Sequence, residues 1–174
     1  NVRNNAIFNV RGTLFPTVNL DNNAELRTGP VGKVFAVQPV AATITGAQIQ
    51  PGGPGGGIGI LEISGGAGAF VLHPNLSMEF DLSGNIPGVT HDQVKSVGGL
   101  TVDLNGAPLS VSIKSNLIRG QSATLIDADA INGTFSGYPE GSLYPTGPPP
   151  VKYVVSYAGG DFTLTRPTLV TLST

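Results

Sequence analysis

Two histidines and a neighbouring aspartate are the first residues whose types and spacing could support chemistry. His73 and His91 are 18 positions apart, and Asp92 directly follows the second histidine. Imidazole and carboxylate groups bind zinc, but a zinc site needs three or four ligands that converge on one point. The sequence places no further ligand beside this pair. We therefore expect both histidines to be ordinary loop residues rather than metal ligands.

Three aspartates near the C-terminus could supply oxygen ligands to a calcium ion. They are Asp127, Asp129 and Asp161. Calcium takes six to eight oxygen ligands, and β-helix proteins that bind it carry a repeated Gly-Asp nonapeptide, which this chain lacks. We expect solvated turn residues at these positions, and calcium binding stays open.

A pair of carboxylates on one strand is the strongest enzymatic pattern. In Ser77–Leu82, Glu79 and Asp81 alternate with apolar residues and are expected to share one outward face. Enzymes that hydrolyse polysaccharides use two carboxylates, but a pair two positions apart on a strand is typical of a solubilising face. No Gly-x-Ser-x-Gly nucleophile motif is present. The sequence therefore predicts no catalytic residue, no cofactor and no enzymatic activity.

Four tyrosines lie in the C-terminal quarter of the chain: Tyr138, Tyr144, Tyr153 and Tyr157. Aromatic rings of this kind can stack on sugars, which would give a surface that binds glycans. They can equally pack inside a C-terminal cap and leave no ring face for a ligand. Both interpretations are kept.

The composition predicts a folded, turn-rich β protein. Charged residues form 11% of the chain, whereas its 25 glycines and 14 prolines exceed a fifth of it. The apolar fraction of 40% and the net charge of -2 are unlike those of a disordered chain. The lysines and arginines are scattered, so no nucleic-acid partner is predicted.

Cysteine and long apolar runs are both missing from the sequence. Without cysteine there are no disulfides and no thiolate metal sites. No apolar run approaches the roughly 20 residues that span a bilayer, so no membrane-spanning segment is predicted. Because the chain starts at Asn1 without methionine, we interpret it as a mature secreted form or an excised fragment.

The candidate residues lie in or beside short runs in which every second residue is apolar, and Gly, Asn or Pro separates one run from the next. This pattern predicts short β-strands. Strands this short fit a parallel β-helix, in which the chain bends every few residues and each coil stacks on the previous one. Pro51–Gly57 is interpreted as a loop between coils. Asp92–Val97 is the one stretch that suggests a helical turn, and Asn105-Gly106 fits a hairpin or a coil corner. Inward ladder positions are expected at Ile7, Val10, Leu14, Val18, Leu20, Leu26, Val34, Val37, Ile44 and Ile49.

The densest strand patterns are C-terminal. Lys152–Tyr157 and Asp161–Thr165 flank Ala158-Gly159-Gly160 and predict a hairpin. Because these strands are the longest in the chain, an antiparallel β-sandwich or jelly roll stays as the alternative fold.

Several motifs follow one another in the second half of the chain. They are GQSATLID at Gly120–Asp127, GTFSGYPEG at Gly133–Gly141, YVVSYAGGD at Tyr153–Asp161 and the FTLT strand. Together with Ile44–Gly65 and Leu76–Gly99, they resemble the passenger β-helix segments of autotransporter-associated, filamentous-haemagglutinin-like bacterial surface proteins. The family's longer GGDGND turn is shortened here to Gly159-Gly160-Asp161. The resemblance implies export, a right-handed parallel β-helix and a structural or adhesive role at the cell surface.

We therefore predict one all-β domain over residues 1–174. Solenoid coils of a right-handed parallel β-helix are expected over 1–130, and a C-terminal antiparallel hairpin cap with a terminal strand over 131–174. The expected function is an extracellular, non-enzymatic scaffold that self-assembles head-to-tail into a filament or surface layer, as a homopolymer. Its subunit-pairing strand is expected at Thr168, Leu169, Val170, Thr171 and Leu172. The alternative is an adhesin or carbohydrate-binding module that holds a surface glycan with the four tyrosines.

Overall fold

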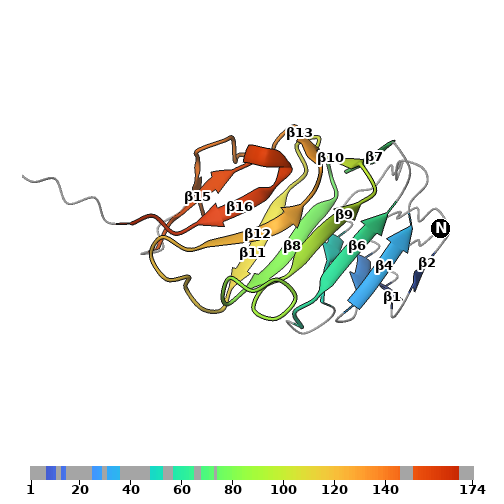
Figure 1. Cartoon of the computed structure of the whole chain (residues 1–174), viewed down its shortest axis with the longest axis horizontal. Coiled ribbons are helices and arrows are strands. Elements are labelled where there is room, and N and C mark those ends of the chain that lie inside the picture. Colours follow the sequence, from blue (N-terminus) through green and yellow to red (C-terminus); the bar gives the residue numbers. More distant parts are fainter. Residues whose placement is uncertain are drawn as a thin grey trace, which may run out of the picture.

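The computed structural model describes residues 7–10, 13–14, 25–28, 31–35, 48–52, 57–64, 68–72, 74–145 and 151–168, with side chains from residue 48 onward except at 64 and 68. These segments contain sixteen β-strands, one 3-10 turn and no α-helix. The strands lie side by side along the length of an elongated molecule (Figure 1). The prediction of an all-β chain with very short strands is confirmed.

Three sheets are formed, and their neighbouring strands are far apart in the sequence. The five-stranded sheet runs in the order β1 (Ile7–Val10), β3 (Glu25–Thr28), β5 (Gln48–Gln50), β8 (Ser77–Leu82) and β11 (Leu109–Ile113). The three-stranded sheet contains β7 (Gly68–Val71), β10 (Leu100–Asp103) and β13 (Ala130–Asn132). The eight-stranded sheet starts with β2 (Thr13–Leu14), β4 (Val31–Phe35), β6 (Ile60–Ser64), β9 (Gln93–Val97) and β12 (Ser122–Asp127). It ends with β16 (Phe162–Thr165), β15 (Tyr153–Ser156) and β14 (Leu143–Tyr144).

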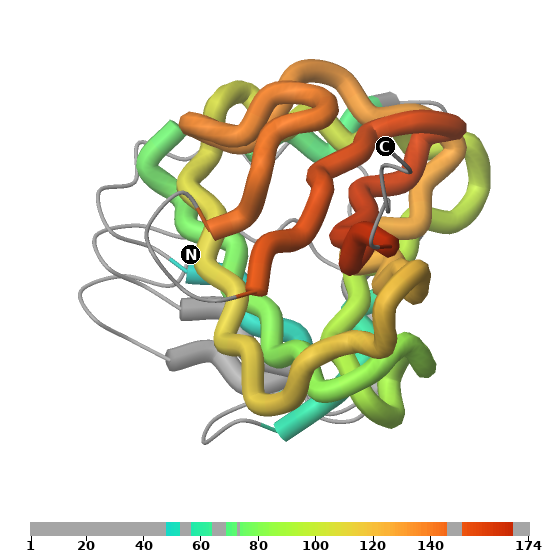
Figure 2. The backbone as a smooth tube through the Cα atoms, turned by 90° about the vertical axis from the view of Figure 1, so that its left-hand side faces the viewer, coloured from blue at the N-terminus to red at the C-terminus, as the bar shows by residue number. Residues whose placement is uncertain are grey.

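Successive strands enter the three sheets in a fixed order. Strands β5, β6 and β7 contribute one strand to each sheet, and β8 to β10 and β11 to β13 repeat this order. Viewed down the long axis, the chain passes around a central core (Figure 2). Ten of the thirteen pairings between described strands are parallel. The antiparallel sandwich or jelly roll, which needs antiparallel neighbours throughout, is therefore wrong.

Among the described strands, the antiparallel pairs all involve the strands that follow β13. Strand β16 pairs antiparallel with both β12 and β15, and β15 pairs with β14. The β15–β16 hairpin turns through the 3-10 segment Ala158–Gly160, as the sequence predicts. In Figure 2 these red strands lie across the end of the molecule that faces the viewer. The change from parallel to antiparallel pairing thus lies close to the predicted boundary at residues 130 and 131.

The core follows the strand alternation. Met78, Phe80 and Leu82 on β8 are buried, and their neighbours Ser77 and Glu79 are half-buried. Adjacent strands in parallel register then build apolar ladders. One of them consists of Leu61, Val94 and Ile126 in the eight-stranded sheet, and all three are buried. The core includes residues from Ile49 to Leu164, so the hairpin strands pack onto the same apolar cluster as the parallel strands.

Two local predictions turn out differently. Asp92–Val97 contains the strand β9 rather than a helical turn, because Val94 is buried in register between Leu61 and Ile126. Asp81 is 2% exposed, so the predicted outward carboxylate face of β8 is wrong at this residue. The loop that follows β8 returns over Asp81, and the backbone N–H of Asp92 in this loop donates a hydrogen bond to the Asp81 carbonyl.

Asn105-Gly106 forms a turn between two sheets and not a hairpin. The flanking strands β10 and β11 belong to different sheets. Asn105 has φ 45°, a left-handed conformation that asparagine tolerates, and its amide donates to the carbonyl of Leu72 at 3.3 Å. This turn is thus tied to the neighbouring part of the chain.

The N-terminal ladder positions are described only in part. Ile49 is buried, and Leu26 is in register with it. The same register pairs Leu26 with Phe8 rather than with Ile7, which pairs with Glu25. Leu14 and Val34 are paired as neighbours. Val10 is in register with the polar Thr28. The remaining predicted positions, Val18, Leu20, Val37 and Ile44, lie outside the described residues.

Candidate functional site

Tyr144 is buried in the C-terminal segment and bonds to the outermost strand of the five-stranded sheet. Its hydroxyl accepts a hydrogen bond from the backbone N–H of Val111 at 2.6 Å and donates to the carbonyl of the same residue at 3.2 Å. The ring is 6% exposed and packs against Tyr138, with 5.0 Å between the ring centroids. Burial raises the pKa of Tyr144, so the hydroxyl keeps the proton that it donates.

Tyr153 and Tyr157 also use their hydroxyls inside the protein. Tyr153 is fully buried and donates to the side-chain oxygen of Asn116 at 3.0 Å. Tyr157 is half-buried, accepts the N–H of Phe135 at 3.0 Å and donates to the carbonyl of Tyr138 at 2.7 Å. Burial raises the pKa of Tyr153, and it raises the pKa of Tyr157 to about 12.

The four tyrosines thus differ in how much ring surface reaches solvent. Tyr144 and Tyr153 present no accessible face for a sugar in this structure, while Tyr138 and Tyr157 are half-buried. Their shared feature is contact with the C-terminal segment and with the core: Tyr157 stacks on Phe162 at 5.2 Å between centroids. This arrangement fits packing in a C-terminal cap better than a row of ligand-stacking rings.

The predicted subunit-pairing strand lies almost entirely outside the described residues. Only Thr168 is described, and it is exposed. Leu169, Val170, Thr171 and Leu172 are not among the described residues, and His73 is not either.

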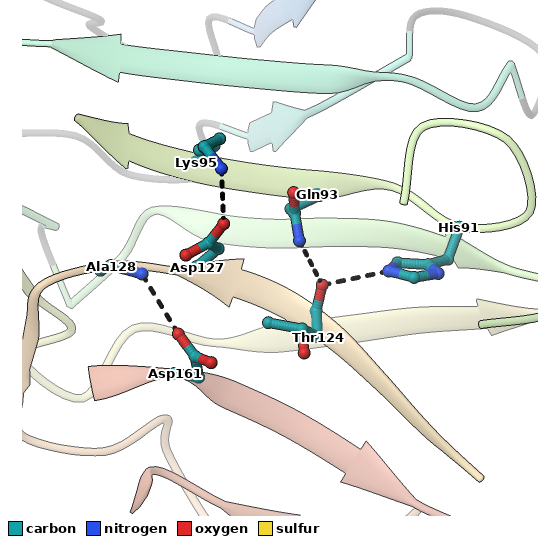
Figure 3. Close-up of polar contacts among 7 residues, drawn as sticks. All are labelled: His91, Gln93, Lys95, Thr124, Asp127, Ala128 and Asp161. Carbon is teal, nitrogen blue, oxygen red and sulfur yellow. Dashed lines mark hydrogen bonds and ion pairs between the residues drawn. The ribbon is translucent and has the colours of Figure 1, made fainter. Parts of the chain in front are cut away.

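A buried polar cluster joins β9 to β12 where these two strands diverge (Figure 3). The strands pair only at Val94 with Ile126 and at Lys95 with Asp127. Before that point the carbonyl of Thr124 accepts a hydrogen bond from Gln93 at 3.0 Å, and it lies 3.1 Å from Nε2 of His91, which donates to it in the tautomer that carries the proton on Nε2. These two side chains therefore supply the donors that the strand ladder does not give.

His91 is fully buried and is fixed at both ring nitrogens. Its Nε2 contacts Thr124, and its Nδ1 contacts the carbonyl of Gly84 at 3.1 Å. Both partners are acceptors, so a neutral imidazole satisfies one of them at a time. Burial lowers the pKa of His91, while the two carbonyls oppose that shift. The histidine thus connects the loop after β8 to the strand β12, which gives it a structural role.

Asp92 is the second buried group of this region. Its carboxylate accepts the backbone N–H of Gly59 and that of Asp81, each at 2.8 Å. Burial raises the pKa of Asp92 to about 7, the two N–H donors oppose the rise, and the charge of Asp81 adds to it. Asp81 in turn lies 3.4 Å from the ammonium group of Lys114. The two carboxyl groups hold three turns of the chain together at one corner.

A row of alternating charge crosses the outer face of the eight-stranded sheet. Lys33, Glu62, Lys95 and Asp127 occupy neighbouring register positions on four successive parallel strands. Lys95 bonds to Asp127 at 2.8 Å, and this carboxylate raises the pKa of Lys95. Beside them Asp161 accepts the N–H of Ala128 at 3.4 Å (Figure 3). The side chains of Glu62, Lys95 and Asp127 are half-buried, and their chemistry is that of cross-strand ion pairs.

Neither a metal centre nor a membrane helix is found in the part of the chain that is described. No group of three or more His, Asp or Glu side chains there could hold a metal ion. Among the same residues, no helix is long and apolar enough to cross a membrane. The sequence predicted a loop position for His91 and a helical turn that starts at Asp92, and it missed the burial of both. The signal that could have revealed it is the placement of three polar residues, His91 to Gln93, directly before the apolar Val94 of a strand.

Comparison with known proteins gives no further identification. No family model, no curated protein and no solved structure matches the chain. The arrangement of its own residues is therefore the basis for a functional proposal.

Proposed function

We propose that this chain is a structural β-solenoid of the extracellular surface, non-enzymatic, which self-assembles through the outer strands of its sheets. The observation that carries the proposal is the fixed order in which successive strands enter the three sheets. Partners in parallel register lie about one coil apart, as for Met78 and Leu109 or Leu61 and Val94. Stacked coils of this kind form a stiff rod whose core is continuous along its axis.

The polar side chains support a scaffold more than a reactive site. Buried groups such as His91 and Asp92 bond to backbone atoms of neighbouring turns. Charged groups such as Lys95 and Asp127 are paired across adjacent strands. Both kinds of contact stabilise the stack of coils. The resemblance of GTFSGYPEG and YVVSYAGGD to secreted surface proteins supports export and the right-handed β-helix.

Self-assembly is supported by the position of the outer strands. Among the described residues, β1 is the outer strand at one end of the five-stranded sheet and β11 at the other. An outer strand can pair with another chain through its main-chain groups. Addition of β1 of one copy to β11 of the next continues the sheet in the same direction, does not close, and produces a filament.

Electron microscopy and light scattering of the purified chain test the proposal. We expect rods or filaments that grow with protein concentration. A truncation that removes Thr168–Thr174 tests whether the predicted terminal strand takes part in pairing in addition to β1 and β11, because assembly should then slow. A chain that is monomeric at high concentration contradicts self-assembly, and a truncated chain that assembles normally contradicts the role of the terminal strand.

A glycan-binding adhesin is the second candidate. The half-buried rings of Tyr138 and Tyr157 support it, while the burial of Tyr144 and Tyr153 does not. A glycan array decides between the candidates. Binding that is lost in Tyr138→Ala and kept in Lys95→Ala, a change on a distant strand, favours the adhesin. The absence of any bound glycan leaves the scaffold as the better supported function.

A further inference from the structure

The hydrogen bonds of β11 show which of its main-chain N–H and C=O groups lie on the edge opposite to β8. In a parallel strand, alternate residues direct their N–H and C=O groups to opposite sides. The carbonyl of Pro108 accepts the N–H of Met78, and the N–H of Lys114 donates to the carbonyl of Leu82. Even-numbered residues here therefore bond to β8. Val111 directs its N–H and C=O to the other side, where a further parallel strand would lie.

A single side chain occupies that position. The hydroxyl of Tyr144 accepts the N–H of Val111 at 2.6 Å and donates to its C=O at 3.2 Å, and both contacts are buried. A phenol hydroxyl can accept one hydrogen bond and donate one. It therefore satisfies both main-chain groups that an added strand would otherwise bond.

Tyr144 is held in place by the C-terminal segment. Leu143 and Tyr144 form β14, which pairs antiparallel with Val154 and Tyr153 of the hairpin. The ring packs on Tyr138, and directly after it the carbonyl of Pro145 accepts a hydrogen bond from Lys152 at 2.6 Å. The same segment thus brings a blocking group to β11 and anchors it on both sides.

We propose that Tyr144 is an autoinhibitory contact: its hydroxyl occupies the hydrogen-bonding position on β11 at which β1 of a second copy of this chain would add as the next parallel strand. The inference rests on the self-assembly proposed above and states how that assembly is regulated. The second copy is the occupant because β1 is the opposite outer strand of the same parallel sheet. Opening of the segment at Tyr144 is then the step that limits assembly.

Tyr144→Phe removes the hydroxyl and keeps the ring. The buried N–H and C=O of Val111 lose their partner, which is costly for buried main-chain groups. We expect hydrogen exchange in Leu109–Ile113 to accelerate by roughly tenfold, and assembly followed by light scattering to start earlier than in the wild type. Tyr153→Phe is the matched control, because its hydroxyl bonds to the side chain of Asn116 and not to an outer strand. It should assemble at the wild-type rate.

If Tyr144→Phe does not fold, a second variant still tests the proposal. Lys152→Ala removes the bond to Pro145, loosens the same segment and keeps the Tyr144 hydroxyl, so it should accelerate assembly by a smaller factor. Faster exchange at β11 without faster assembly in the folded variants overturns the proposal. If Tyr144→Phe and Lys152→Ala assemble while the wild type and Tyr153→Phe do not, the autoinhibitory contact is supported and the proposed self-assembly of the wild type is wrong. When every variant assembles at the wild-type rate, the autoinhibitory contact alone fails.

Discussion

The carboxylate of Asp92 accepts the backbone N–H of Asp81 at 2.8 Å, and both side chains are buried at the same corner of the chain. The burial of Asp92 and the charge of Asp81 both disfavour the ionised form of Asp92. The proton on Asp92 is therefore held more tightly in the folded protein than in the unfolded one, which makes the stability of the fold sensitive to pH.

Asp92→Asn should change the pH dependence of stability. The folded pKa of Asp92 is raised from 3.8 to about 7. The stabilising proton is therefore fully present below pH 4, and its contribution is lost as the pH rises to about 7. Asparagine carries no titrating group, so the free energy of unfolding of the variant should lie furthest below that of the wild type at about pH 4 and below. The gap should narrow by up to a few kcal/mol towards pH 7. Urea unfolding of both proteins across this range measures it.

The difference between the two proteins, rather than the wild-type profile alone, isolates Asp92. Burial lowers the pKa of His91, so its contribution has the opposite sign: it is present above pH 6.5 and is lost in acid. A gap between wild type and Asp92→Asn that stays constant with pH contradicts a raised pKa at Asp92.

The shared acceptor at Thr124 predicts coupling between two donors. His91→Leu and Gln93→Leu each leave the Thr124 carbonyl with one donor, since both side chains bond to it. Each single change should cost about 1 kcal/mol of unfolding free energy. The double variant leaves this carbonyl without either donor, so its loss should exceed the sum of the single losses by roughly 1 kcal/mol. Additive losses in urea unfolding would show that the two side chains act independently.

The ion pair between Lys95 and Asp127 should contribute little to stability. Both side chains are more than a third exposed, at 45% and 40%, so Lys95→Ala should cost less than about 1 kcal/mol and the cost should shrink at high salt. Lys95→Glu should cost more, because it adds a negative charge beside Glu62, Asp127 and Asp161, which all act on this position. Unfolding at low and high salt checks both. An equal loss in the two variants argues against the charge row.

Two adjacent glycines in the hairpin turn form a matched pair for testing how the hairpin docks. A Cβ on Gly160 would lie 2.6 Å from the carbonyl oxygen of Ala128 and 2.8 Å from that of Asp129, whereas one on Gly159 meets nothing. Both have positive φ, at 90° and 72°. Gly159→Ala should therefore cost about 1 kcal/mol from backbone strain, and Gly160→Ala distinctly more because the turn must move away from Ala128 and Asp129, which connect β12 to β13. Equal losses in thermal or urea unfolding would contradict close packing at Gly160.

Much of the local structure could be predicted from the sequence. The alternation of Ser77–Leu82 identifies Met78, Phe80 and Leu82 as core residues, and the two dense runs around Ala158–Gly160 predict the hairpin. Local patterns suffice in these places because side chains alternate between the two faces of a strand, and because glycine adopts the left-handed turn easily.

The polar contacts could not be predicted in the same way. Asp81 lies on the outward face by alternation, yet the returning loop and Asp92 bury it. Asp92–Val97 has no local feature that marks it as a strand, and its pairing with β6 decides its conformation. The partners of Tyr144, His91 and Asp92 lie from 7 to 33 positions away along the chain.

The sequence by itself determined that this protein is an all-β chain of short strands with a C-terminal hairpin. The reason is that strand period and turn chemistry are local properties of the chain. Only the tertiary structure decided between the predicted parallel pairing and its antiparallel alternative, and only it showed that Asp81 and Asp92 share a buried corner and that Tyr144 bonds to Val111. These features depend on which distant segments become neighbours, and the free energy of burial and of backbone hydrogen bonding across the whole stack determines that choice.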